Sequence, residues 1–74
     1  MARIPTDLSG QEVRRALQRA GFVFRRQRGS HMVLGRDQPP ARVVVPDHRR
    51  IRKGTLNQIL HDADLTAEEL LDLL

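Results

Sequence analysis

The sequence predicts an α+β domain in which helices cover one face of a three-stranded antiparallel sheet. Two segments, one before residue 21 and one after residue 53, have apolar residues at helical spacing. Three short segments between them are rich in β-branched or aromatic residues and are separated by Gly, Ser and Pro. Two layers bury these apolar faces most economically when the helices share one side of the sheet. The 74 residues are expected to form a single domain over 1–74.

The first helix is predicted over residues 9–20. Ser9 and Glu12 have the S-x-x-E spacing of a capping box, in which each side chain accepts a hydrogen bond from the other residue's backbone N–H. Gly21 is expected to end the helix in the left-handed conformation, with Phe22 folding back onto the last turn. The apolar stripe of this helix consists of Val13, Ala16, Leu17 and Ala20.

The three strands are predicted over residues 22–27, 30–35 and 41–46. If Arg28 and Gly29 form a two-residue hairpin turn, Arg26 pairs with His31 on one face of the sheet. A three-residue loop would shift the pairing by one residue and turn His31 to the other face of the sheet. The sequence pattern therefore does not decide which face His31 lies on. The third strand follows a Pro-Pro turn and stops at Pro46, which has no N–H to donate to a ladder.

A second helix is expected after a polar connector, followed by a short extra helix. The apolar stripe of the second helix consists of Leu56, Ile59, Leu60 and Ala63. Thr66 and Glu69 have the spacing of another capping box, which starts the extra helix. The apolar face of this extra helix consists of Leu70, Leu71, Leu73 and Leu74. The acidic tail, 62–72, is expected either to remain free or to pack Leu70, Leu71 and Leu74 onto the sheet.

Charge is unevenly distributed along a chain whose net charge is +4. Residues 25–53 carry nine cations and two acids, whereas residues 54–74 carry five acids and no Lys or Arg. All the cations except Lys53 are arginine, whose planar guanidinium matches phosphate oxygens. The basic middle therefore favours a surface that faces a polyanion, and the alternative is a merely solubilising surface.

Composition excludes several classes of protein. The absence of cysteine excludes disulfides, thiol nucleophiles and cysteine-ligated zinc. No Gly-rich phosphate loop or H-E-x-x-H motif is present, and no acidic pair brackets the histidines, so neither a metal nor another cofactor is expected. No apolar run approaches the ~20 residues that span a bilayer, and the N-terminus lacks a signal-peptide core. We expect a soluble cytoplasmic protein that does not contact the membrane.

The histidines are the main candidates for chemistry. His61 is expected to be a solvated helix residue, and His48 to be either an ordinary loop residue or an RNA contact. His31 begins a strand directly after several arginines. It could be a hydrogen-bonded residue at a strand end, but nearby positive charge favours the neutral imidazole, which accepts protons.

Three motifs in the same order carry a resemblance to a known family. They are Gly-Ser-His at 29–31, Pro-x-His at 46–48 and Gly-Thr-Leu at 54–56. Together they resemble the HicA (YcfA-like) mRNA interferase toxins of bacterial toxin–antitoxin pairs, over almost the whole chain. The sequence departs from many members at Met32, where they have another histidine or a polar residue.

The resemblance implies a fold like that of the double-stranded-RNA-binding domain, α-β-β-β-α. It also implies a type II toxin that cleaves mRNA, and a HicB-like antitoxin protein as its inhibitor. The catalytic role of the motif histidine falls on His31. His48 matches the family pattern without a role to carry over.

A metal-independent mechanism follows from this assignment. His31 would act as general base on the RNA 2′-hydroxyl, and Arg26 or Arg28 would offset the charge that builds on the phosphate. His48 or solvent would protonate the leaving oxygen. The residues expected to bind RNA are Arg25, Arg26, Arg28, Ser30, His48, Arg49 and Lys53.

Two other functions compete with the toxin. A non-catalytic double-stranded-RNA-binding module would need the arginines but not His31. A protein-interaction domain would dock an acidic partner on the basic face and would not bind RNA.

Overall fold

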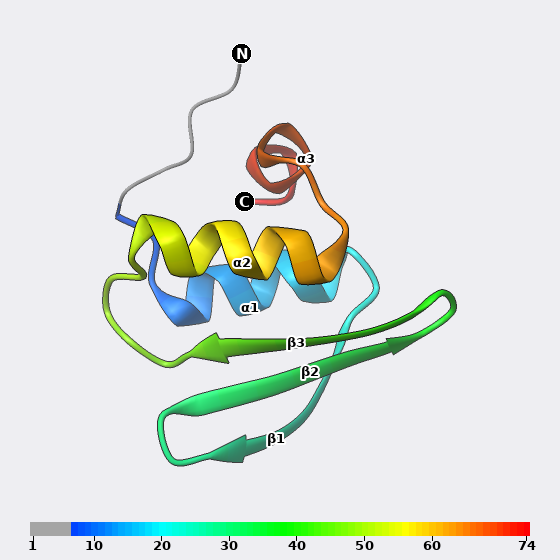
Figure 1. The fold of residues 1–74 in the computed structure, drawn as a ribbon, viewed down its shortest axis with the longest axis horizontal. Helices are drawn as coiled ribbons and strands as arrows, with labels where there is room; N and C mark the ends of the chain where they lie inside the picture. The colour runs from blue at the N-terminus through cyan, green and yellow to red at the C-terminus, as the bar shows by residue number, and fades with distance from the viewer. Residues whose placement is uncertain (1–6) are drawn as a thin grey trace.

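The computed structural model describes residues 7–74 and has the predicted order of elements, with three helices and three strands (Figure 1). The expectation about a signal-peptide core falls partly on residues 1–6, outside this part of the chain. Within residues 7–74, no helix is both long enough and apolar enough to cross a membrane. The elements are α1 (Gly10–Arg19), β1 (Val23–Arg28), β2 (His31–Asp37), β3 (Pro40–Pro46), α2 (Lys53–Ala63) and α3 (Ala67–Leu73).

The helices and the sheet form two layers. The strands are antiparallel in the order β1-β2-β3, and α1 and α2 cover one face of the sheet (Figure 1). No helix among residues 7–74 covers the opposite face, which is called the open face below. This arrangement confirms the predicted α+β fold.

The boundaries of α1 arise from local hydrogen bonds that the sequence predicts. The Glu12 N–H donates to Ser9 Oγ over 3.1 Å, and the Ser9 N–H donates to Glu12 Oε1 over 3.0 Å. The bond from the Ser9 N–H lowers the pKa of Glu12 below its ordinary value. At the other end Gly21 has a φ of 99°, and the Phe22 N–H donates to the Leu17 carbonyl over 3.0 Å, as expected for this helix end.

The hairpin turn between β1 and β2 differs from the predicted one. Gly29 and Ser30 form the turn, so Arg28, not Arg26, lies opposite His31. Gly29 has a φ of 58°, which suits glycine at the first central position of a two-residue turn. The pairing of Arg26 with His31 that an Arg28-Gly29 turn would give does not occur. Arg26 and His31 still share the open face, because Arg26 pairs with Val33 two residues along β2.

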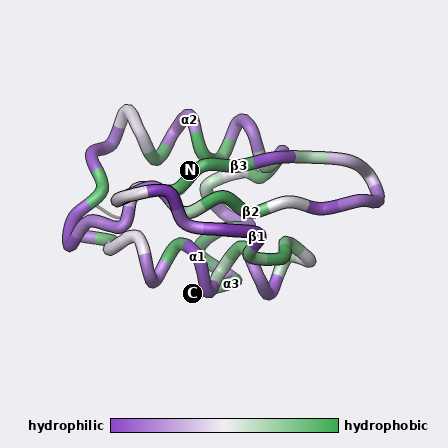
Figure 2. The backbone as a smooth tube through the Cα atoms, turned by 90° about the horizontal axis from the view of Figure 1, so that it is seen from below, coloured by the Kyte–Doolittle hydropathy of each residue, from purple (hydrophilic) through white to green (hydrophobic). Residues whose placement is uncertain are grey.

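A β-bulge in β1 places a further arginine, Arg25, on the open face. The register shifts between Phe24 and Arg26, which leaves Arg25 without a partner in β2. Its side chain lies over Gly35, where a Cβ would be 2.9 Å from Arg25 Nε. Gly35 lacks the side chain that would otherwise project there, so the arginine fills this position. Consistent with its sequence, β1 is hydrophilic along most of its length (Figure 2).

The core lies between the helices and the inner face of the sheet. Its fully buried side chains include Leu17, Met32, Leu34, Val43, Val45, Leu56 and Leu70. The extra helix does not pack on the sheet, one of the two expected outcomes, because α3 lies against α1. Only Leu70 of this helix is buried, whereas Leu71 and Leu74 are 38% and 45% exposed. The second strand also runs beyond its predicted end, to Asp37, and Pro40 begins the third.

Candidate active site

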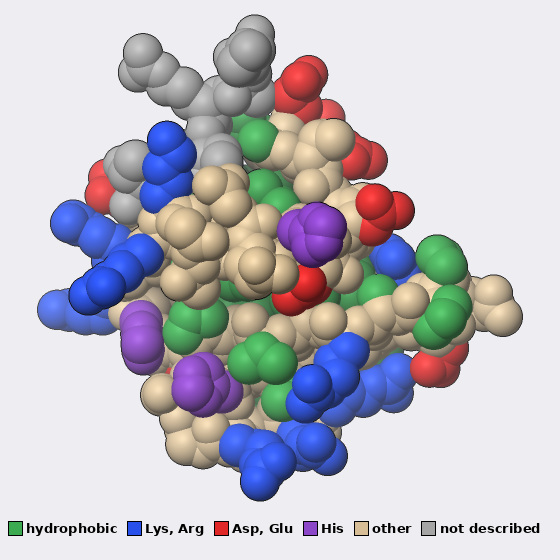
Figure 3. Space-filling model, viewed as in Figure 1, with side chains coloured by type: hydrophobic (Ala, Val, Ile, Leu, Met, Phe, Trp, Pro, Cys, Tyr) green, Lys and Arg blue, Asp and Glu red, His purple; other side chains and the backbone are tan. Residues whose placement is uncertain are grey.

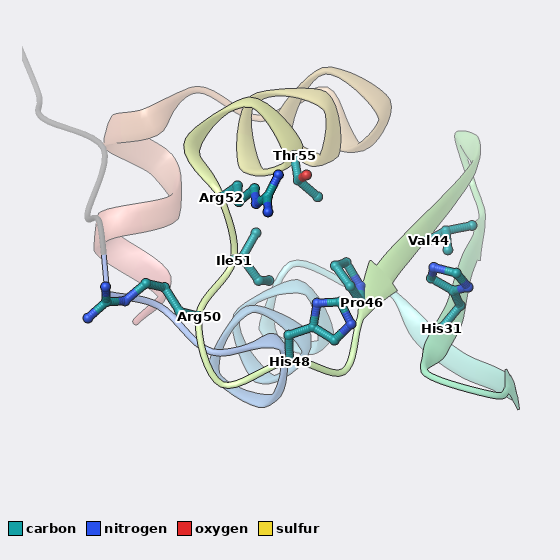
Figure 4. A pocket seen from close by; sticks show the side chains of 8 residues that line it. All are labelled: His31, Val44, Pro46, His48, Arg50, Ile51, Arg52 and Thr55. Atoms are coloured by element: carbon teal, nitrogen blue, oxygen red, sulfur yellow. The ribbon is translucent and has the colours of Figure 1, made fainter.

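A pocket of about 450 Å³ lies at the end of the sheet where β2 begins and β3 ends (Figure 4). Its walls come from β2, β3, the loop between β3 and α2, and the first turn of α2. Two imidazoles line this one space although their residues are far apart in the sequence. The lining residues are His31, Val44, Pro46, His48, Arg50, Ile51, Arg52 and Thr55.

His31 is placed by the hairpin turn and by sheet pairing. It is the first residue of β2, and it lies between Arg28 on one neighbouring strand and Pro46 on the other. Because side chains alternate along β2, burial of Met32 against the helices puts the His31 ring on the open face. The ring is exposed and lies beside Val44 at the edge of the pocket (Figure 4).

His48 is placed by a loop that the backbone holds on both sides. The Gly10 N–H donates to the His48 carbonyl over 2.8 Å, and the Asp47 N–H donates to the Ser30 carbonyl over 2.6 Å. Farther along, the Ile51 N–H donates to the Leu8 carbonyl over 2.8 Å, and the Ile51 side chain is only 3% exposed. The loop is thus tied to α1, to the hairpin turn and to the core, while the His48 side chain remains exposed.

Hydrogen bonds to the carboxylate of Asp47 join α1 and β1 to the loop after β3. Gln11 Nε2 of α1 donates to Asp47 Oδ1 over 3.1 Å, and Gln27 Nε2 of β1 donates to Asp47 Oδ2 over 3.1 Å. Gln27 Nε2 also donates to the Gly29 carbonyl over 3.1 Å. These bonds hold the loop that carries His48 against the turn that precedes His31.

Gly10 permits the close contact between α1 and this loop. A Cβ at Gly10 would lie 2.0 Å from the Pro46 carbonyl oxygen and 3.1 Å from Asp47 Cα. Backbone atoms cannot move aside as the tip of a flexible side chain can, so only glycine fits here.

The charge on the pocket walls is positive. Arg50 and Arg52 line the pocket, and no acidic side chain does. Arg50 Nη2 lies 3.4 Å from Asp7 Oδ1, but both side chains are largely exposed, so water weakens this ion pair. An anionic group would therefore meet two guanidinium groups and two imidazoles.

A second basic pocket, of about 400 Å³, extends over the open face of the sheet. Arg25, Arg26 and Arg42 contribute to its walls, and the Arg25 guanidinium pairs with Asp37 over 3.1 Å. Lysine, arginine and histidine side chains gather on the sheet side of the molecule and at the end that holds the β3–α2 loop (Figure 3). Both pockets thus have arginine side chains on their walls.

The structure brings some of the predicted site residues together and separates others. His31 and His48 share the first pocket, Arg25 and Arg26 line the second, and Ser30 contributes a backbone carbonyl that holds the loop. Three predicted residues are exposed but line neither pocket, namely Arg28, Arg49 and Lys53.

Sequence reasoning missed the other side chains of the first pocket as site residues. Arg50 and Arg52 belong to the basic connector, and only their alternation with Arg49 and Ile51 hinted that they face one side. Pro46 and Thr55 lie within the motifs already noted. Within residues 7–74, no group of three or more His, Asp or Glu side chains is arranged to hold a metal ion.

Comparison with known families gives one match. The family model described as the HicA toxin of bacterial toxin–antitoxin systems matches residues 10–65. This span includes every residue that lines the first pocket, and it ends before α3. A search of curated proteins gives no match.

Proposed function

The chain belongs to the HicA toxin family of bacterial toxin–antitoxin systems, and on this basis we propose that it is a metal-independent endoribonuclease that cleaves mRNA. The observation that carries the proposal is the exposed His31 ring in a pocket whose only charged walls are arginines. The whole chain, 1–74, would act as one toxin domain. An antitoxin partner is implied by the family, and we propose a HicB-like protein in this role.

The proposed chemistry uses the nucleophile that RNA itself supplies. The neutral imidazole of His31 removes the proton of a ribose 2′-hydroxyl, and that oxygen attacks the adjacent phosphorus. A positioned general base contributes about 10²–10⁴-fold to the rate of such a step. The exposure of His31 and its place at a pocket mouth leave room for the ribose and phosphate.

Arginine side chains would stabilise the negative charge that develops on the phosphate. Arg50 and Arg52 share the pocket with His31 and are candidates for this role. Arg26 and Arg28, on the same face of the sheet, would hold neighbouring phosphates. Ser30, Arg49 and Lys53 would contact the RNA near the pocket. Arg25, which lies over Gly35, would contact it farther along the open face.

The test is cleavage of an mRNA by the purified protein, with and without an excess of chelator. His31→Ala is expected to lose about 10²–10⁴-fold in rate while it keeps its thermal unfolding temperature, because the side chain is exposed. His61→Ala, on an exposed position of α2 outside the pocket, is the matched control and should cleave normally.

The outcomes separate this proposal from its competitor. Cleavage by His31→Ala at the wild-type rate would show that His31 is not the general base. RNA binding by the wild-type protein without any cleavage would favour a double-stranded-RNA-binding module. Activity that disappears with chelator and returns with magnesium would contradict metal independence.

A further inference from the structure

Cleavage by the 2′-hydroxyl needs a second proton transfer that His31 does not supply. When the bond from phosphorus to the 5′-oxygen breaks, that oxygen leaves as a strongly basic alkoxide unless it is protonated. A general acid at this position contributes about 10²–10⁴-fold. The pocket that holds the base is therefore the place to look for an acid.

The lining of the pocket contains one other suitable group. Val44, Pro46 and Ile51 have no titratable side chain, and the hydroxyl of Thr55 holds its proton near neutral pH. Arginine keeps its proton at any physiological pH, which excludes Arg50 and Arg52 as proton donors. Among the residues that line this pocket, only His48 remains.

The fold holds His48 as a catalytic group has to be held. Its backbone carbonyl accepts the Gly10 N–H. The preceding residue, Asp47, donates its N–H to the Ser30 carbonyl of the hairpin turn, and its carboxylate accepts from Gln27 of β1. The His48 side chain is exposed. Its ring enters the pocket from the loop, whereas the ring of His31 enters it from β2 (Figure 4). Two imidazoles approaching one space from different elements suit a base and an acid on opposite sides of a phosphate.

We propose that His48 is the general acid of the reaction, an inference that rests on the proposed function. His31 takes the proton of the 2′-hydroxyl, and the 2′-oxygen forms a bond to phosphorus. The bond to the 5′-oxygen breaks, and the His48 imidazolium gives its proton to that oxygen. The products are a 2′,3′-cyclic phosphate and a free 5′-hydroxyl, with no metal or other reactant consumed.

The experiment compares two RNA oligonucleotides that differ by one atom at a mapped cleavage site. One has the natural 5′-oxygen as leaving atom, and the other has sulfur in its place. A thiolate leaves without a proton because thiols are far more acidic than alcohols. The oligonucleotides are cut by the full-length wild-type protein, by His31→Ala, by His48→Ala and His48→Gln, and by the control His61→Ala.

We expect His48→Ala and His48→Gln to cut the natural RNA about 10²–10⁴-fold more slowly than wild type, and the sulfur-containing RNA less than about tenfold more slowly. His31→Ala should be slow on both substrates, and His61→Ala should match wild type on both. RNA affinity of the His48 variants, measured without turnover, should fall far less than their rate of cutting the natural RNA.

Other results overturn the assignment. Equal losses by the His48 variants on both substrates would mean that His48 only binds or positions RNA. If His31→Ala cut the sulfur-containing RNA at nearly the wild-type rate, His31 would be the general acid and not the general base. If wild type cuts neither RNA, the endoribonuclease proposal itself fails, an outcome distinct from selective failure of the His48 variants.

Discussion

The carboxylate of Asp47 is the side chain that connects the two histidine-bearing segments. It accepts hydrogen bonds from Gln11 and Gln27, on two different elements, at 3.1 Å each. Displacing a reacting group by about 1 Å can cost on the order of 10²-fold in rate. We therefore expect Asp47 to affect the proposed catalysis without contacting the substrate.

Asp47→Asn is expected to lower kcat by about 10–100-fold with little change in KM, because the amide offers one acceptor where two are used. The unfolding free energy should fall by only ~0.5–1.5 kcal/mol. Adding Gln27→Glu, which supplies an acceptor for the new amide, should recover part of kcat. Cleavage kinetics and thermal unfolding check both. If the double variant loses as much kcat as Asp47→Asn alone, the hydrogen bond to Gln27 is not what positions the loop.

The helix ends show which elements can be predicted from sequence. Each capping box of α1 and α3 joins residues three positions apart, so the short pattern contains the whole interaction. The turn between β1 and β2 was harder, since Arg28-Gly29 and Gly29-Ser30 both place glycine in a two-residue loop. The choice depends on which register buries Met32 and Leu34, a property of the assembled sheet.

The site was less predictable than the fold for the same reason. His31 was identified from its motif and its position, and that assignment stays a prediction. The meeting of His31 with His48 depends on contacts of Gly10 and Asp47 that join distant segments. A sequence pattern of local spacing contains no information about such contacts, and the packing of α3 on α1 was missed in the same way.

The end of α2 offers a test of element stability. Asp64 has a φ of 58°, a left-handed conformation that costs a residue with a side chain roughly 1 kcal/mol. Asp64→Gly is expected to raise Tm by about 4–8 °C. Asn57→Gly, at an exposed position inside the same helix, should lower stability by ~0.5–1 kcal/mol. A lower Tm for Asp64→Gly in calorimetry would show that the aspartate side chain stabilises this helix end.

At the scale of the whole molecule, charge separates by side. The open face of the sheet and the loop after β3 carry most of the cations of residues 25–53. The first turn of α3 instead carries Glu68 and Glu69. A polyanion approaching the molecule is therefore drawn to the side that holds both pockets.

RNA affinity should fall steeply with salt, since bound cations displace counterions from the RNA. Changing Arg25, Arg26 and Arg28 together to Gln is expected to reduce the slope of log affinity against log salt by about 2 for a single strand. Arg15→Gln, on the exposed surface of α1, is the control and should leave the slope nearly unchanged. A slope altered only by Arg15→Gln would mean that the RNA lies on the helices instead of on the open face.

The same cationic side is the expected docking surface of the antitoxin. An acidic partner would associate quickly with this side and would be repelled by the acids of α3. Hydrogen exchange on the complex should show protection over residues 28–36 and little over 64–74. Protection concentrated on 64–74 would mean that the antitoxin acts at a distance from His31.

The backbone anchoring of the loop after β3 also makes it a useful place for a reporter. Its position depends on the main-chain bonds of Asp47, His48 and Ile51, so the exposed Arg49 side chain between them takes no part in holding it. The natural chain contains no cysteine. Arg49→Cys therefore provides a unique attachment point for a fluorophore, on a fixed support beside the pocket, from which the arrival and departure of RNA or antitoxin can be followed in real time.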